Sequence, residues 1–490
     1  MLPLEDWCST ALARPAGQPA IEFEHRWFSW GELRQLADQL GELLEASGAA
    51  TDAPVAFVPR NHPSAIAALI ALLAKRRTVR MIYAFQSPAA IARDVERLHP
   101  AILVAASEDC KVPVLNVLHS RGIAGIALSG MDAAALPTFE RSRANDAASH
   151  GAPPRIEILT SGTTGPPKQF GISYELIAKH FLGSPGGDLS SLPPTLLCFP
   201  LGNISGIYST LPPLLKGQRA VLLERFSVAG WHDYLLRYRP AASGLPPAGV
   251  QMVLDANIPP EDLSCLRRLG TGAAPLDPTV HRAFEERYCV PILLSYGATE
   301  FGGPVTAMTA ELHADWGSRK FGSVGRALPG AQLRVIDPDT GDCLPPGQEG
   351  VLEVISPRIG ADWIRTSDVA VIDEDGFLFH RGRNDGAIMR GGFKILPETI
   401  ERALMLHPAI SAAAVIGIND ARLGQVPAAA IQFKRGMQPP DAAQLEAHLR
   451  QHLPSTHVPA HWRFVEAMPR TPSLKVERPG LRRLFEPGSD

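Results

Sequence analysis

Thr160-Ser161-Gly162-Thr163-Thr164-Gly165-Pro166-Pro167-Lys168 follows residues 156–159, whose sequence Ile-Glu-Ile-Leu predicts a strand. The glycines allow close approach of the backbone to an anion, the hydroxyls and N–H groups can donate hydrogen bonds, and Lys168 adds a positive charge. The spacing GxxxxGK[ST] of a Walker loop does not occur here. We therefore expect either a polyphosphate-binding loop of another kind or, if the string is taken in isolation, an ordinary turn.

Outward from this loop, apolar helical segments alternate with short strand-like runs. Residues 30–46 predict an amphipathic helix and residues 63–74 a buried one. Strands are expected at 101–105, 155–159, 196–199 and 220–223. Such alternation predicts an α/β fold with large, mostly parallel sheets flanked by helices.

The pattern changes in the last third of the chain. Residues 322–380 combine turn-rich segments with expected strands at 333–337, 351–355, 369–372 and 377–380, which predicts a β-rich subdomain. Beyond Asn384, a helix starting at Pro397 and a strand at 413–418 predict a small α+β domain. We therefore expect an N-terminal core, residues 1–384, and a mobile C-terminal domain, residues 385–490.

Composition excludes several classes of protein. A chain of 490 residues exceeds one compact core, since a domain averages about 150 residues. A net charge of -3 makes no electrostatic case for nucleic acid or an anionic membrane. The six cysteines are scattered, so neither a disulfide framework nor a zinc site is expected. No signal peptide or membrane span is recognisable, which makes a cytoplasmic protein the expectation.

Further motifs follow the loop in order. Tyr296 offers an aromatic face suited to a purine, and Glu300 offers a carboxylate suited to a hard cation beside phosphate oxygens. The segments are Gly272-Ala273-Ala274-Pro275, Ser295-Tyr296-Gly297-Ala298-Thr299-Glu300, Thr366-Ser367-Asp368, Gly382-Arg383-Asn384-Asp385, Gly391-Gly392 and Pro469-Arg470-Thr471-Pro472-Ser473-Leu474-Lys475.

In this order, the segments resemble the adenylate-forming superfamily of acyl- and aryl-CoA ligases, peptide-synthetase adenylation domains and firefly luciferase. The resemblance runs from about residue 20 to residue 480 and is nearest in kind to bacterial acyl- or aryl-CoA ligases. It implies that the loop closes over the β- and γ-phosphates of ATP, and that Lys475 is the catalytic residue.

The resemblance also implies roles for the remaining motif residues. Gly272, Ala273 and Ala274 would lie along adenine, and Tyr296 would stack on it. Thr299 would bind the α-phosphate, Glu300 would bind Mg²⁺, and Asp368 and Arg383 would bind or approach the ribose. Asp385 would be the hinge between the two domains. Gly391 and Gly392 would line the tunnel for the thiol, with a simple turn as the alternative.

The acyl pocket is expected near residues 199–206 and 301–305. No carboxylate stands in the first of these segments to pair with an α-ammonium group, which disfavours α-amino acids. Asn203 and Gly302 are the candidate pocket residues. Asn203 could bind a polar group of the substrate or simply cap a turn, and the two interpretations have equal weight.

Several positions depart from the family's pattern. Leu474 replaces the glycine before the catalytic lysine, Ser367 the glycine before the ribose aspartate, and Met389 a frequent lysine. Gln169 and residues 75–78 also differ from the usual pattern.

Three functions are compatible with this sequence. The first is a CoA ligase that uses ATP, Mg²⁺ and a small-molecule carboxylic acid. The second has the same first step but loads a carrier protein's phosphopantetheine arm. The third is a nucleotide-binding protein that has lost catalysis, which the three departures at Leu474, Ser367 and Met389 motivate.

Overall fold

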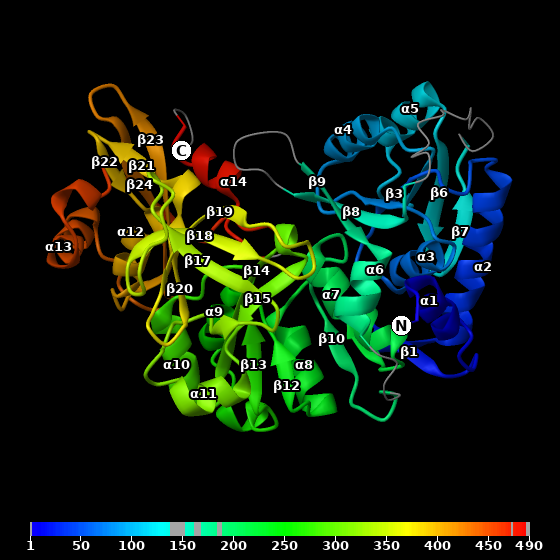
Figure 1. Cartoon of the computed structure of the whole chain (residues 1–490), viewed down its shortest axis with the longest axis horizontal. Helices are drawn as coiled ribbons and strands as arrows, with labels where there is room; N and C mark the ends of the chain where they lie inside the picture. The colour runs from blue at the N-terminus through cyan, green and yellow to red at the C-terminus, as the bar shows by residue number, and fades with distance from the viewer. Residues whose placement is uncertain (1, 138–151, 161–167, 184–188, 472–473, 487–490) are drawn as a thin grey trace. The chain divides into compact units, whose positions relative to one another are not determined.

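The computed structural model describes residues 2–137, 152–160, 168–183, 189–471 and 474–486. The chain forms two compact units, Met1–Pro240 and Ala241–Asp490 (Figure 1). The predicted domain boundary between residues 384 and 385 falls inside the second unit and stays a prediction.

The first unit contains a large sheet with the order β7-β6-β5-β3-β4-β8-β9. The five central strands are parallel, and one antiparallel strand closes each edge. The strands are β3 Val55–Val58, β4 Val79–Met81, β5 Ile102–Ala106, β6 Ala124–Ser129, β7 Asp132–Ala135, β8 Arg155–Thr160 and β9 Lys168–Ser173. The parallel centre confirms the predicted α/β class.

A second, smaller sheet of this unit has the order β10-β11-β1-β2. Its strands are β1 Pro19–Phe23, β2 Arg26–Ser29, β10 Thr195–Leu197 and β11 Ala220–Leu222. One buried apolar cluster contains residues from both sheets and from the helices between them. The first unit is therefore built around a shared core.

The helices of the first unit begin where the sequence supplies caps. Ser29 and Glu32 form a capping box at α2 Trp30–Ala46, and His62 caps α3 Pro63–Ala74. Both helices have the predicted bounds, and α3 is buried against α1 Leu4–Leu12 and α2. The others are α4 Pro88–Leu98, α5 Val112–Arg121, α6 Tyr174–Leu176 continued by a π-helical turn, α7 Ile204–Leu215 and α8 Val228–Tyr238.

The second unit begins with a sheet of order β12-β13-β14-β15-β16. Its strands are β12 Ala242–Gly244, β13 Arg268–Thr271, β14 Ile292–Ala298, β15 Gly303–Ala307 and β16 Arg326–Ala327, flanked by α9 Pro247–Asp255, α10 Pro278–Tyr288 and α11 Ala310–Trp316. An antiparallel sheet follows with β17 Gln332–Ile336, β18 Glu349–Ile355, β19 Ile364–Ile372 and β20 Leu378–Arg383. This second sheet confirms the predicted β-rich segment.

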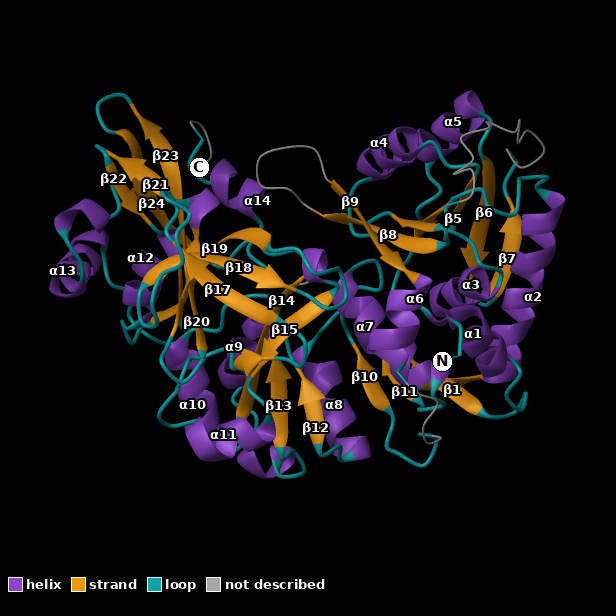
Figure 2. Cartoon of the chain, viewed as in Figure 1, coloured by secondary structure: helices purple, strands orange, loops and turns teal. Residues whose placement is uncertain are grey.

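The C-terminal part has its own small sheet and helices (Figure 2). Strands β21 Ile388–Arg390, β22 Phe393–Ile395, β23 Ile410–Asp420, β24 Gly424–Phe433 and β25 His461–Val465 accompany α12 Pro397–Met405, α13 Ala442–His452 and α14 Arg478–Arg483. Ile400, Ala403 and Leu404 of α12 are buried together, as the helical spacing predicted.

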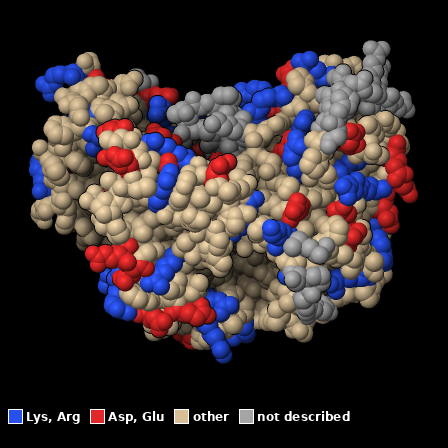
Figure 3. Space-filling view, viewed as in Figure 1, with Lys and Arg blue, Asp and Glu red and all other residues tan. Residues whose placement is uncertain are grey.

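The surface is mixed in charge. On the face shown in Figure 3, basic and acidic side chains are interspersed rather than separated by sign, in keeping with the small net charge of -3. Within the described ranges, no helix has both the length and the apolar character needed to cross a bilayer.

Candidate active site

The end of β14 carries three of the predicted residues. Tyr296 lies in the strand, and Thr299 and Glu300 lie in the single 3₁₀ turn that follows it. Gly302, at φ 66°, turns the chain back into β15. Tyr296 and Thr299 are half-buried and Glu300 is exposed, so this loop presents polar side chains where parallel strands end.

The neighbouring strand β13 ends at the predicted adenine segment. A Cβ atom on Gly272 would lie 2.6 Å from Ser295 Oγ of β14, so the close approach of the two chains requires glycine. Ala273 is exposed and adopts φ 67°, a left-handed conformation that alanine rarely occupies. Such backbone strain often accompanies a ligand-binding segment.

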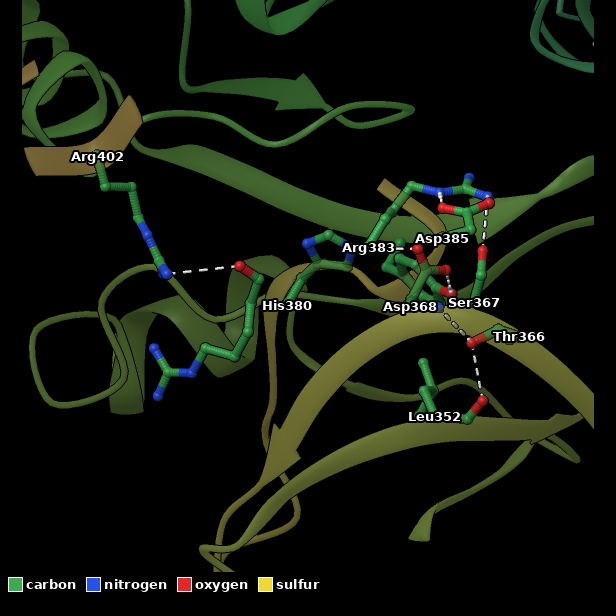
Figure 4. Close-up of polar contacts among 10 residues, drawn as sticks. Leu352, Thr366, Ser367, Asp368, His380, Arg383, Asp385 and Arg402 are labelled. Carbon is green, nitrogen blue, oxygen red and sulfur yellow. Dashed lines mark hydrogen bonds and ion pairs between the residues drawn. The ribbon is translucent and has the colours of Figure 1, made fainter. Parts of the chain in front are cut away.

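Asp368, in β19, holds a carboxylate between two protein donors (Figure 4). Tyr296 Oη donates to Asp368 Oδ2 at 2.5 Å, and His380 Nε2 lies 3.3 Å from Asp368 Oδ1. The backbone N–H of Asp368 donates to Thr366 Oγ1 at 3.0 Å, which fixes the local chain. Sequence motifs pointed to Tyr296 and Asp368 but not to His380.

The surroundings keep Asp368 ionised and Tyr296 protonated. Burial acts to raise the pKa of Asp368, but the hydrogen bonds from His380 and Tyr296 and the charge of Arg383 outweigh it, so the pKa is lowered. Burial, followed by the charge of Asp368, raises the pKa of Tyr296. The site therefore offers a charged acceptor to hydroxyl donors.

Arg383, the last residue of β20, links the ribose motif to the predicted hinge. Its Nε and Nη2 donate to Asp385 Oδ1 and Oδ2 at 2.9 and 2.6 Å, and Nη2 also donates to Ser367 Oγ at 2.6 Å. Ser367, which departs from the family's glycine, thus gives Arg383 an additional partner. Asp385 follows β20 and lies in the 3₁₀ turn Asn384–Gly386.

Lys475 follows Leu474 in the second unit, and charged residues of the same site act on it. Desolvation and the charge of Arg383 lower the pKa of Lys475, and Glu300 acts in the opposite direction. The residue as a whole is exposed, although desolvation is the largest cause of the lowered pKa. Charges from two distant parts of the sequence, Arg383 and Glu300, thus both influence Lys475.

The loop before Lys475 retains a glycine-like conformation without glycine. Leu474 has φ 62°, and backbone hydrogen bonds join Thr471 N to Lys475 O and Leu474 N to Thr471 O, each at 2.7 Å. The left-handed region costs a residue with a Cβ about 1–2 kcal/mol. Leu474 therefore occupies a conformation that glycine would adopt without this cost.

Gly391 and Gly392 form the exposed turn between β21 and β22. Their φ values are 55° and 87°, and Gly391 N donates to Leu423 O at 2.8 Å. Met389 and Phe393, on either side of the turn, are also exposed.

In the first unit, β8 and β9 form a hairpin whose last pair is Thr160 with Lys168. The predicted loop residues Ser161, Gly162, Thr163, Thr164 and Gly165 lie outside the described residues. The motif is thus followed by a strand, β9, rather than by the helix that follows a Walker loop, which agrees with the missing Walker spacing.

The predicted acyl-pocket segment is anchored by a residue that motif analysis missed. Asn61, 1% exposed, donates from Nδ2 to the carbonyls of Phe199 and Leu223 at 3.1 and 3.2 Å, and its Oδ1 accepts from Leu201 N at 3.0 Å. Asn203 caps α7 by accepting from Gly206 N at 2.8 Å. Of its two predicted roles, the cap is the one seen here.

The described residues contain no group of three or more His, Cys, Asp or Glu that could hold a metal ion. Glu300, exposed at the end of β14, is a single carboxylate near Lys475. A lone carboxylate fits Mg²⁺ that is coordinated mainly by phosphate oxygens and water.

Comparison with known proteins gives a consistent result. The AMP-binding enzyme family matches residues 8–361, and the AMP-binding enzyme C-terminal domain matches residues 399–475. A sulfoacetate–CoA ligase from Cupriavidus necator is 29% identical over 475 residues, covering 92% of this chain and 91% of that protein. A 2-succinylbenzoate–CoA ligase from Bacillus cereus is 30% identical over 351 residues, covering 67% and 70%.

Solved structures agree on the fold. ATP-bound MatB from Rhodopseudomonas palustris matches with a TM-score of 0.80 at 23% identity, covering 100% of both chains. The amide bond synthetase McbA from Marinactinospora thermotolerans matches with a TM-score of 0.77 at 25% identity, covering 99% of this chain and 100% of that one.

Proposed function

The chain belongs to the AMP-binding enzyme family, and on that premise we propose that it is an AMP-forming acid–thiol ligase. It converts a carboxylic acid and ATP into acyl-AMP and pyrophosphate, and then transfers the acyl group to the thiol of coenzyme A. The relatives named as CoA ligases, which align over most of this chain, support the choice of acceptor.

One observation supports the site assignment most directly. Arg383 Nη2 donates to Ser367 Oγ, next to the Asp368–Tyr296 pair, and the charges of Arg383 and Glu300 both act on the pKa of Lys475. Binding of a nucleotide with a reacting α-phosphate needs three groups in one place. They are a cation, a hydrogen-bond acceptor for the ribose and a carboxylate that can bind a metal ion.

In the first half-reaction, a carboxylate oxygen attacks the α-phosphorus of ATP and pyrophosphate leaves. The two reactants are both anionic and repel each other. Lys475 binds between them, holds the attack geometry and neutralises the charge that develops in the transition state. Burial and the charge of Arg383 lower the pKa of Lys475, and the charge of Glu300 opposes that shift.

Glu300 and phosphate oxygens would hold Mg²⁺, which offsets the negative charge of the phosphates when it is bound. Asp368 accepts hydrogen bonds from the ribose hydroxyls, and Tyr296 both braces that carboxylate and offers its ring to adenine.

In the second half-reaction, the thiol attacks the acyl carbon and AMP leaves with the bonding electrons. Acyl-AMP makes this step easier because AMP is a better leaving group than oxide. The C-terminal domain rotates about Asp385, so Lys475 leaves the site and the turn Gly391–Gly392 approaches it. The ion pair of Asp385 with Arg383 would have to tolerate this rotation or break during it.

The substrate is a carboxylic acid other than an α-amino acid. The residues of the segment 199–206 include no carboxylate for an ammonium group, and Asn203 Oδ1 is used in capping α7. Relatives named for sulfoacetate, indoleacetate and 2-succinylbenzoate favour acids with a second polar or aromatic group.

A pyrophosphate-release assay over aromatic, short-chain, medium-chain, polycyclic and dianionic acids tests the proposal, with and without CoA. Pyrophosphate release that rises with CoA, together with a thioester found by mass spectrometry, is the expected result. Release without CoA thioester, but with loading of a phosphopantetheinylated carrier protein, would identify the carrier as the acceptor. ATP binding with no release for any acid would favour loss of catalysis.

A further inference from the structure

The side chain of His380 reaches Asp368 because β20 contains a β-bulge. Val369 pairs with Gly382, but the next residue, Ala370, pairs with His380, so Arg381 is an extra residue on β20. In a regular ladder Arg381 would be opposite Ala370 and would share the face of Asp368. The bulge places the imidazole on this face instead.

Two features hold the bulge in shape. Gly382 adopts φ 152°, which residues with a Cβ rarely adopt, and a Cβ there would lie 2.6 Å from Glu398 Oε2, so that side chain would have to move. Arg402 Nη2 of α12 donates to the carbonyl of Arg381 at 3.4 Å (Figure 4). The position of His380 is therefore built into the local fold.

The two donors to Asp368 act on different oxygens. Tyr296 binds Oδ2 and His380 Nε2 lies beside Oδ1, with the Asp368 side chain only 15% exposed and that of His380 17% exposed. Each carboxylate oxygen can accept two hydrogen bonds, so one site on each oxygen remains for a ligand. A carboxylate held at both oxygens cannot rotate about its Cβ–Cγ bond without breaking one of these contacts.

Building on the proposed function, we propose that His380 is a positioning residue that orients Asp368 for two adjacent hydroxyls and so selects a ribonucleotide over a 2′-deoxyribonucleotide. Without His380, the carboxylate is held at one oxygen only. The carboxylate can then rotate to accept a hydrogen bond from one hydroxyl at a time. The second hydroxyl of the ribose therefore contributes much less to binding. The imidazole does not itself touch the nucleotide.

Binding of AMP and 2′-deoxy-AMP to the full-length protein, measured by calorimetry, tests this assignment. The preference for AMP should fall about tenfold in His380→Phe, the scale of one hydrogen bond to a charged group. Affinity for 2′-deoxy-AMP should change little. His380→Gln, which can place an amide donor near the Nε2 position, should recover most of the preference.

Asp368→Asn serves as the reference variant, because it alters the carboxylate that accepts both ribose hydroxyls and should lose the preference for AMP over 2′-deoxy-AMP. If His380→Phe binds AMP with the full wild-type preference while Asp368→Asn does not, the positioning role is wrong and the proposed function stands. If the wild-type protein binds neither nucleotide, both are wrong. Equal weakening of the two nucleotides in His380→Phe, without rescue by His380→Gln, would also overturn the role, because it would indicate general damage.

Discussion

Asn61→Ala is the substitution whose cost the structure predicts most directly. The side chain satisfies three backbone groups, the carbonyls of Phe199 and Leu223 and the N–H of Leu201, and it is 1% exposed. At the low end of about 1 kcal/mol for each group left without a partner, the variant should lose about 3 kcal/mol of stability in the first unit.

Asn203→Ala provides a matched scale because it makes the same truncation in the same unit. It removes one hydrogen bond from a half-buried cap, at a cost of about 1 kcal/mol. Urea unfolding of the two variants, with hydrogen exchange of the peptide 199–203, measures both the global and the local effect. The KM for the acid should rise in Asn61→Ala while the KM for ATP stays near the wild-type value.

If Asn61→Ala destabilised the protein no more than Asn203→Ala, the three hydrogen bonds would not support the loop as the structure indicates. Protection of the peptide 199–203 at the wild-type level in Asn61→Ala would show the same. Either result would refute the link between buried anchoring and the acyl-pocket segment.

Four further predictions concern the C-terminal part. Lys475→Ala should slow acyl-AMP formation about 10²–10³-fold, the effect of removing one preorganised charge, and should leave CoA transfer from supplied acyl-AMP largely intact; single-turnover assays separate the two steps. Because the pKa of Lys475 is lowered, the adenylation rate should begin to fall at a less alkaline pH than an ordinary lysine would give. In a pH–rate profile, Lys475→Arg should shift this alkaline limb to higher pH. Leu474→Gly should adenylate at least as fast as wild type. Leu474→Val should release pyrophosphate about tenfold more slowly, because valine tolerates φ 62° poorly. Equal rates in the two variants would show that the backbone conformation at residue 474 is unimportant. Asp385→Pro should block transfer to CoA and spare adenylation, while Asp385→Ala, which loses the same ion pair with Arg383 but keeps a flexible backbone, should retain transfer; parallel loss in both variants would contradict the hinge.

Much of the fold could be predicted because its signals are local. Ser29 and Glu32 mark the start of α2 by a capping box, and Pro63 fits the first turn of α3, so both helices have the predicted bounds. Strand ends were less accurate. The strand expected at 196–199 is β10 Thr195–Leu197, because Phe199 has already left the sheet to bond Asn61.

In the candidate site too, some residues could be predicted from the sequence and others could not. Tyr296, Asp368 and Lys475 stand in recognisable motifs, but Asn61 and His380 act through partners that only the folded chain reveals. The carbonyls bound by Asn61 lie 138 and 162 residues away. His380 faces Asp368 because one extra residue shifts the register of β20, and no periodicity in the sequence announces such a shift.

The contact of Arg402 with the bulge has a consequence for product release. Arg402 lies in α12, within the segment predicted to rotate between the half-reactions, and it supports the backbone that aims His380 at Asp368. Thermodynamic linkage is reciprocal, so any factor by which docked α12 tightens the hold on ribose is the same factor by which bound ribose favours docked α12. Undocking of the helix and release of AMP are then coupled, and each favours the other by the same factor.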